Sequence, residues 1–192
     1  MKPLVLMGNI GCGKTSWGKV LSQKGYNVIC EDLTAVTHLN EYWKTGQNAF
    51  FTQLEFYISW IELYNKSQSC KQLCLIDSSI LSHHLVFTKY MFNKNILSAE
   101  EFQICNSLFE NILELIDINV VYLYCNSVEL INRIKRRNRE SELNSYNYII
   151  DLDNMFNEVV EQYNIPVIDI SNLDVNNDDD VDYFVKKMKE IK

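Results

Sequence analysis

The fold of this chain is decided by the stretch Gly8-Asn9-Ile10-Gly11-Cys12-Gly13-Lys14-Thr15-Ser16. It fits the pattern G-x-x-x-x-G-K-[ST], in which backbone N–H groups surround a phosphate, the lysine neutralises phosphate charge and the next hydroxyl ligates Mg²⁺. The apolar run Leu4–Met7 leads into it, and residues 14–24 have the apolar spacing of a helix. A loop between a strand and a helix sets a helix N-terminus where a phosphate would lie. We therefore predict that residues 8–16 bind the phosphates of a nucleotide.

Length and composition indicate one domain. The chain has 192 residues, of which 47% are hydrophobic, enough for one substantial core. No apolar run is as long as a signal sequence or a membrane span, so we expect a soluble mature protein that begins at Met1 and has no membrane partner. The six cysteines form no C-x-x-C pair, which favours free thiols and a cytoplasmic location.

The net charge of −7 limits the class of partner. Duplex nucleic acid requires a broad basic surface, which such a chain is not expected to have. A small anionic ligand held by a local group of cations is compatible with this charge. We therefore expect small-molecule partners and not nucleic acid.

Short apolar segments alternate with helical patterns along the rest of the chain. Further strands are expected at residues 26–30, 73–76, 119–124 and 166–170, and helices at residues 48–65, 80–92, 98–116, 145–163 and 181–191. Another helix is expected to be capped by Ser127 and to end in the basic run at 133–140. Parallel strands need crossovers and a cover on both faces. The pattern therefore predicts a three-layer α/β fold, with helices on both faces of a five-stranded parallel sheet.

Two acidic residues come directly after predicted strands. Glu31 follows the strand that we expect beside the phosphate loop, and Asp77 follows the strand at residues 73–76. Ligands of open α/β sheets bind at the C-terminal ends of the strands. Glu31 is a candidate base for an acceptor hydroxyl, and Asp77 is a candidate to hold Mg²⁺ together with Thr15. A solvated loop carboxylate and a helix-capping aspartate are the structural alternatives.

A run of cations ends the helix that begins near Ser127. Five of the eighteen Lys and Arg residues fall between Arg133 and Arg139. Interaction with the helix dipole accounts for one or two of them. Arg133 and Arg137 share one helical face, which suits a lid that closes on phosphate oxygens, because arginine binds phosphate through two parallel hydrogen bonds. A nucleic-acid surface is the competing interpretation, weakened by the acidic residues that follow.

Taken together, these motifs resemble the deoxynucleoside kinase family, whose members phosphorylate the 5′-hydroxyl of deoxynucleosides. Residues 8–14 are close to the family's G-N-I-G-S-G-K, with Cys12 in place of serine. Glu31 matches the family's catalytic base. Tyr42 stands eleven residues before Gln53, as the family's ribose-binding tyrosine stands before its base-reading glutamine.

The resemblance continues to the C-terminal part of the chain. The pattern Arg137-x-Arg139-x-x-Glu142 resembles the family's lid, whose arginines bind phosphates and whose glutamate meets the sugar 3′-hydroxyl. Residues 167–175 resemble the last strand and the loop that packs on adenine. The resemblance thus runs along nearly the whole chain.

The resemblance implies a single P-loop kinase domain of residues 1–192 with a lid at about residues 133–144. The implied cofactors are Mg²⁺ and ATP or another NTP. The implied catalytic residues are Lys14, Glu31, Arg137 and Arg139. The residues implied to bind ATP are those of the loop 8–16, Arg133, Arg137, Asp174 and Val175. The residues implied to bind the nucleoside are Glu31, Tyr42, Gln53, Trp60, Ser78, His83 and Glu142. The implied metal ligands are Thr15 and Asp77.

Three residues depart from the family pattern. Ser78 stands where the family's D/E-R-S motif has an arginine that steadies the reacting hydroxyl and phosphate. Trp60 takes the place of a base-pocket arginine, and His83 takes the place of an aspartate. Because that arginine and aspartate pair with each other in the family, their joint absence suggests a rebuilt base pocket and leaves room for an unusual acceptor.

The leading hypothesis is an ATP-dependent deoxynucleoside kinase with Glu31 as general base. A thymidylate-like nucleoside monophosphate kinase would need arginines in the acceptor helix, and residues 48–65 contain none. A kinase of a hydroxyl on a modified base in DNA, and a P-loop protein that binds nucleotide without turnover, stay open as alternatives. The expected partners are a nucleoside and an NTP. The helices between Ile80 and Ile116 resemble those through which the family forms homodimers.

Overall fold

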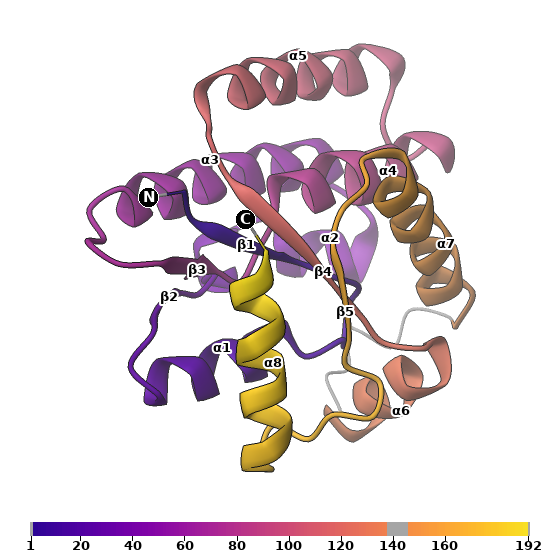
Figure 1. Cartoon of the computed structure of the whole chain (residues 1–192). Coiled ribbons are helices and arrows are strands. Elements are labelled where there is room, and N and C mark those ends of the chain that lie inside the picture. Colours follow the sequence, from indigo (N-terminus) through magenta and orange to yellow (C-terminus); the bar gives the residue numbers. More distant parts are fainter. Residues whose placement is uncertain (1, 138–145, 192) are drawn as a thin grey trace.

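A five-stranded parallel sheet forms the centre of the molecule (Figure 1). The computed structural model describes residues 2–137 and 146–191. The strands are β1 (Leu4–Met7), β2 (Asn27–Ile29), β3 (Cys74–Ile76), β4 (Asn119–Tyr124) and β5 (Val167–Asp169), in the spatial order β2-β3-β1-β4-β5. Every neighbouring pair is parallel. The predicted sheet is confirmed.

Helices cover both faces of this sheet. The longer ones are α1 (Lys14–Gln23), α3 (Ala49–Ser67), α5 (Ala99–Leu115), α6 (Ser127–Arg137), α7 (Tyr146–Gln162) and α8 (Asp178–Glu190). Figure 1 shows α1 and α8 on one side of the sheet and α3, α5 and α7 on the other. These are the three predicted layers. None of the described helices combines the length and the apolar character that a membrane span requires.

The side chains of β1 divide the hydrophobic core into two parts. Leu4 and Leu6 face α1 and α8, where Trp17 stacks on Phe184 with 4.3 Å between the ring centroids. The other two residues of β1 pack against α3, α5 and α7. Successive side chains of a strand point to opposite faces. A strand covered on both faces therefore needs the unbroken apolar run that precedes the phosphate loop.

The helix after β3 runs unbroken from Ile80 to Asn93. Its middle is a π-helical segment, η2 (Ser82–Thr88), and its end is α4 (Lys89–Asn93). The hydroxyl of Thr88 donates to the carbonyl oxygen of His83, five residues earlier, at 2.7 Å. The wider π turn changes which side chains share a face of the helix, and such turns often occur at functional sites.

Two expected helix starts differ from the structure. Asn126 caps α6 in place of Ser127, because its Oδ1 accepts the backbone N–H of Glu129 at 3.0 Å. The last helix, α8, begins at Asp178 and not at residue 181, because the side chain of Asn177 accepts the N–H groups of its first turn. In both cases an asparagine one or more residues earlier takes the capping role.

The neighbourhood of β2 also differs from expectation. Because β3 lies between β2 and β1, Glu31 follows the edge strand and not a strand beside β1. A short 3₁₀ helix, η1 (Leu33–Ala35), and α2 (Leu39–Thr45) follow β2, and both contribute residues to the wall of the cavity described below. Both are too short to show a helical period in the sequence.

Candidate active site

A cavity of about 1130 Å³ opens at the C-terminal edge of the sheet. Its walls include the phosphate loop, the ends of β2 and β3, one side of α3, η2, α6 and the loop after β5. The predicted site residues that line it are Gly8, Ile10, Gly11, Gly13, Lys14, Thr15, Ser16, Glu31, Tyr42, Gln53, Asp77, Ser78, His83, Arg133, Asp174 and Val175. The fold thus brings most of the predicted site into one space.

The phosphate loop curls around its own lysine. Lys14 Nζ donates to the carbonyl oxygens of Gly8 at 2.8 Å and Asn9 at 3.2 Å. Gly11 and Gly13 have φ angles of 81° and 110°, which glycine adopts without strain. At Gly11 a Cβ atom would also come within 2.7 Å of the side chain of Ile134. The glycines therefore allow both the backbone conformation of the loop and its close packing against Ile134. The ammonium group of Lys14 lies within the curve of the loop.

Two side chains of the loop point away from the cavity. Asn9 Nδ2 donates to the carbonyl oxygen of Ile149 at 3.2 Å, and Asn9 Oδ1 accepts the N–H of Ile10 at 2.7 Å. Cys12 is buried in the core with Trp17. The contribution to nucleotide binding that we predict for Asn9 and Cys12 therefore falls to their backbone groups.

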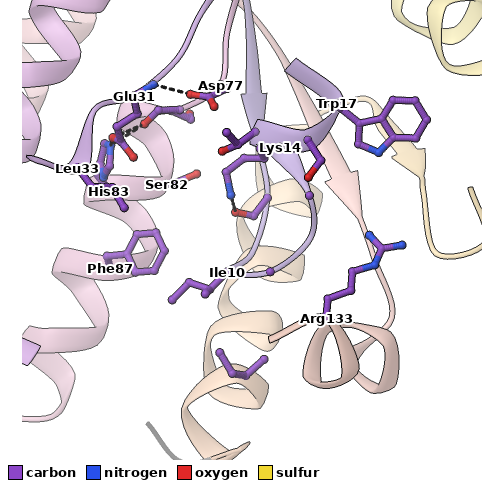
Figure 2. Close-up of a pocket in the computed structure, with 18 of the residues that line it drawn as sticks. Ile10, Lys14, Trp17, Glu31, Leu33, Asp77, Ser82, His83, Phe87 and Arg133 are labelled. Atoms are coloured by element: carbon purple, nitrogen blue, oxygen red, sulfur yellow. Dashed lines mark hydrogen bonds and ion pairs between the residues drawn. The ribbon is translucent and has the colours of Figure 1, made fainter. Parts of the chain in front are cut away.

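Glu31 forms a three-membered cluster with Ser78, which lies between β3 and the helix that begins at Ile80, and with His83 of η2. Its Oε1 accepts hydrogen bonds from His83 Nε2 at 3.0 Å (Figure 2) and from Ser78 Oγ at 2.7 Å. Ser78 Oγ lies 2.9 Å from His83 Nε2. Burial alone would raise the pKa of Glu31. The attraction of His83, the hydrogen bonds from His83 and Ser78, and the charge of Lys14 outweigh burial and hold this pKa below its usual value. Glu31 is therefore ionised at neutral pH.

Asp77 joins the ends of β2 and β3. Its Oδ1 accepts the backbone N–H of Glu31 at 2.6 Å, and its carboxylate also hydrogen bonds with the side chain of Thr15. Burial raises the pKa of Asp77 above its usual value, although both hydrogen bonds oppose the shift. A carboxylate beside a hydroxyl supplies hard oxygen ligands of the kind that Mg²⁺ takes along with nucleotide phosphates and water. The donor set thus fits the predicted metal.

The far end of the cavity has aromatic walls and one buried amide. Gln53 Oε1 lies 2.9 Å from Thr88 Oγ1. Phe56 and Phe87 line the same space, together with Tyr42. Burial raises the pKa of Tyr42 to about 12, so its hydroxyl stays protonated. Flat apolar walls with a few placed polar groups suit a heterocyclic base.

Trp60 does not line this cavity. Its side chain is fully buried between α3 and β3, stacked on Tyr64, and its Nε1 donates to the carbonyl oxygen of Ser78 at 3.0 Å. The structure thus places Trp60 behind the site, where it holds the backbone of Ser78, and not in the nucleoside pocket as the resemblance implies.

Trp60→Phe should therefore reduce stability more than nucleoside affinity. It leaves the buried carbonyl of Ser78 without its donor, which costs about 1–3 kcal/mol. The free energy of unfolding, measured by circular dichroism in urea, checks this. Tyr183→Phe on α8 is the matched control, because Tyr183 is exposed. Unchanged stability with a raised nucleoside KM would instead return Trp60 to the pocket.

Arg133 supports the phosphate loop from outside. Its guanidinium donates to the carbonyl oxygens of Cys12 at 2.6 Å and Ile170 at 3.2 Å, and to Glu129 at 2.9 Å. Figure 2 shows it beside the loop, on the side opposite Glu31. The structure therefore gives Arg133 a loop-holding role at the edge of the cavity.

The predicted lid lies largely outside the described residues. Arg139, Glu142 and the side chain of Arg137 fall there, so their roles stay predictions. Arg136, which the sequence did not single out, lines the cavity and contacts Glu129 at 3.2 Å.

The cavity wall also includes residues that were not predicted, among them Phe56, Ser82 and Phe87. Phe56 lies one turn after Gln53 on α3, and this spacing could have found it. Ser82 and Phe87 belong to η2, and no sequence signal indicates a π turn there. The hydroxyl of Ser82 is buried and has no hydrogen-bond partner in the described part of the chain.

The fold and the site define a P-loop kinase, with a phosphate loop on β1 and carboxylates at the ends of β2 and β3. The family model for deoxynucleoside kinases matches residues 4–192, and the chain belongs to this family. It is therefore an ATP-dependent kinase that transfers a phosphoryl group to deoxynucleosides.

Solved structures with a similar fold include a deoxyadenosine kinase from M. mycoides. With the products dCMP and a flexible dCDP bound, that enzyme matches with a TM-score of 0.83 and 22% identity over 100% of both chains. With dATP bound, it matches with a TM-score of 0.82 and 21% identity over 98% of this chain and 100% of that chain. No curated protein matches the chain. At these identities the structural likeness shows the fold alone.

Proposed function

We propose that this enzyme transfers the γ-phosphoryl group of ATP to the 5′-hydroxyl of a deoxynucleoside, with Glu31 as general base. The observation that supports this best is the ionised carboxylate of Glu31, on the wall of the same cavity as Lys14. The 5′-oxygen forms a bond to the γ-phosphorus and its proton passes to Glu31. The bond from the γ-phosphorus to the bridging oxygen breaks, and ADP leaves. Such a transfer asks the protein mainly for positioning and for charge stabilisation.

The donor end of the cavity is proposed to hold ATP. Lys14 and the N–H groups of the loop would face the phosphates, and Asp174 and Val175 of the loop after β5 line the side where adenine would pack. We keep Arg137 and Arg139 as proposed lid residues for the phosphates, and Glu142 as the proposed partner of the 3′-hydroxyl. The lid at about residues 133–144 and the single domain are part of the same proposal.

Thr15 and Asp77 are proposed to hold Mg²⁺. When bound, the ion would neutralise charge on the β- and γ-phosphates. Thr15, Asp77 and Lys14 line the same cavity, and Thr15 and Lys14 both act to lower the pKa of Asp77. Asp77 also fixes the backbone of Glu31, so one carboxylate links the metal ligands to the base.

An uncharged acceptor fits the opposite wall better than a monophosphate. Among the described residues that line the cavity, the arginines are Arg133 and Arg136, and both come from α6 on the side of the phosphate loop. Neither α3 nor η2 contributes a lysine or arginine to this lining. A phosphate on the acceptor would need such cations, whereas a nucleoside has no charge there.

The base is proposed to be adenine or cytosine. Gln53 offers one amide, which carries both a donor and an acceptor, and each of these bases presents an amino group next to a ring nitrogen. The related fold from M. mycoides was solved with dATP and with dCTP. Tyr42 is proposed to hold the sugar beside this base.

One assay tests the proposed function. ATP consumption with Mg²⁺ is measured against deoxynucleosides, nucleoside monophosphates and DNA oligomers with hydroxymethylated bases. We expect turnover with deoxyadenosine or deoxycytidine and none with the other two classes. ATP binding without turnover on any acceptor would favour a non-catalytic nucleotide-binding protein.

A homodimer is proposed through the helices between Ile80 and Ile116. On α5, the apolar side chains of Ile104, Leu113 and Leu115 are exposed, Leu115 by 80%. Light scattering after size-exclusion chromatography would distinguish a dimer from a monomer of 22.5 kDa.

A further inference from the structure

Within the described residues, the side-chain hydrogen bonds of Glu31 are all made by one of its two carboxylate oxygens. Ser78 Oγ and His83 Nε2 both reach Oε1, at 2.7 Å and 3.0 Å. In the part of the chain that the structure describes, no hydrogen bond or ion pair reaches Oε2. The carboxylate therefore has one oxygen engaged with the protein and one left for another proton donor.

The hydrogens of this cluster can be assigned by counting. Ser78 has a single hydroxyl hydrogen, and Ser78 Oγ donates it to Glu31. The 2.9 Å contact between Ser78 Oγ and His83 Nε2 then requires a hydrogen on Nε2. The same N–H points toward Glu31 Oε1. Both side chains thus act as donors, and His83 does so whether its ring is neutral or protonated.

The two donors are themselves held firmly. Ser78 and His83 are exposed by only 3% and 5%. The carbonyl oxygen of Ser78 accepts from Trp60, and that of His83 accepts from Thr88. The ring of His83 stacks on Phe56 with 4.8 Å between centroids. A carboxylate held by such neighbours has little freedom to rotate.

We propose that Ser78 and His83 are positioning residues that act through Glu31: by holding Oε1 they aim Oε2 at the acceptor hydroxyl. This rests on the proposed role of Glu31 as base. It also gives Ser78 and His83 a role other than the nucleoside contact that the resemblance implies. Ser78 stands at the position of the arginine in the family's D/E-R-S motif. Ser78 and His83 together supply two hydrogen-bond donors to Glu31, so the site can keep its base oriented without that arginine.

The test compares His83→Phe, His83→Gln and Ser78→Ala, each alone and combined with Glu31→Gln. His83→Phe keeps a flat ring against Phe56 but removes the hydrogen-bond donor. We expect kcat to fall by about 10-fold or more, because misplacing a catalytic group can lower the rate by about 10²-fold. The nucleoside KM should change little. His83→Gln places an amide N–H near the position of Nε2 and should recover part of kcat. In the Glu31→Gln background, neither His83→Phe nor Ser78→Ala should lower kcat further.

Other outcomes separate the alternatives. A raised nucleoside KM with normal kcat, or a full additional loss in the Glu31→Gln background, would show that His83 contacts the substrate and would overturn the proposal. Normal kcat in Glu31→Gln itself would instead overturn the proposed function. If His83→Phe does not fold, the smaller Ser78→Ala change decides by the same measurements. His38→Gln is the matched control, because His38 pairs with Glu55 at 2.8 Å and does not line the cavity.

Discussion

Glu31→Gln should lower kcat by about 10²-fold or more while ATP affinity hardly changes, because general base catalysis contributes at least this factor. Glutamine keeps the shape of the side chain and can still meet the donors Ser78 and His83 through its carbonyl oxygen. It cannot take a proton from the acceptor hydroxyl. Steady-state kinetics with a saturating nucleoside, together with a binding measurement for ATP, check this result.

The pH profile of kcat/KM should show that catalysis requires the deprotonated form of Glu31. A base works only when it is deprotonated, so activity should be lost as the pH falls through the pKa of Glu31 in the free enzyme. His83, Ser78 and Lys14 outweigh burial and hold this pKa below its usual value, so the acid limb that belongs to Glu31 should lie at a lower pH than the ordinary pKa of a glutamate. In Glu31→Gln this limb should be absent.

Glu62→Gln serves as the control for this experiment. Glu62 is an exposed carboxylate on α3 and lies outside the cavity lining, so the change should leave kcat and the pH profile as they are. If Glu31→Gln retained kcat or kept the acid limb, Glu31 would be only a loop carboxylate. Asp32 and Asp77 would then be the next candidates for the base.

Lys14→Met should reduce turnover by at least about 10²-fold, because electrostatic stabilisation of the transferring group is usually the largest catalytic contribution. The ammonium group also donates to two carbonyl oxygens of the loop, Gly8 and Asn9. Its removal therefore takes away the positive charge that would face the phosphates. It also removes the two hydrogen bonds that hold the curved backbone of the loop. We expect weaker ATP binding in addition to the lower kcat.

The measurement for Lys14→Met is kcat and the ATP KM, after circular dichroism has shown that the variant is folded. Lys186→Met is the matched control, since Lys186 is exposed on α8, away from the cavity. Near-normal turnover in a folded Lys14→Met variant would contradict the assignment of residues 8–16 as the phosphate loop.

Much of the fold follows from local patterns in the sequence. The run Leu4–Met7 and the loop 8–16 define a strand, a turn and a helix within a few residues of each other, and all three are found. The other strands and the long helices follow from apolar periods that a single segment shows by itself. Likewise, Glu31 and Asp77 are recognisable because each follows a strand, and strand ends meet at one edge of a parallel sheet.

Only the tertiary structure decides how the side chains of the site meet. Glu31 and His83 are 52 residues apart in the sequence. Their contact depends on β3 lying next to β2 and on the π-helical geometry of η2, which sets the direction of the His83 side chain. The same packing turns Trp60 away from the cavity, to the back of Ser78. A hydrophobic period or a sequence motif depends only on residues that are close together along the chain. These contacts instead depend on which distant segments pack together. The hydrogen bonds from Ser78 and His83 to Glu31 therefore could not be predicted from the sequence and are found only in the folded structure.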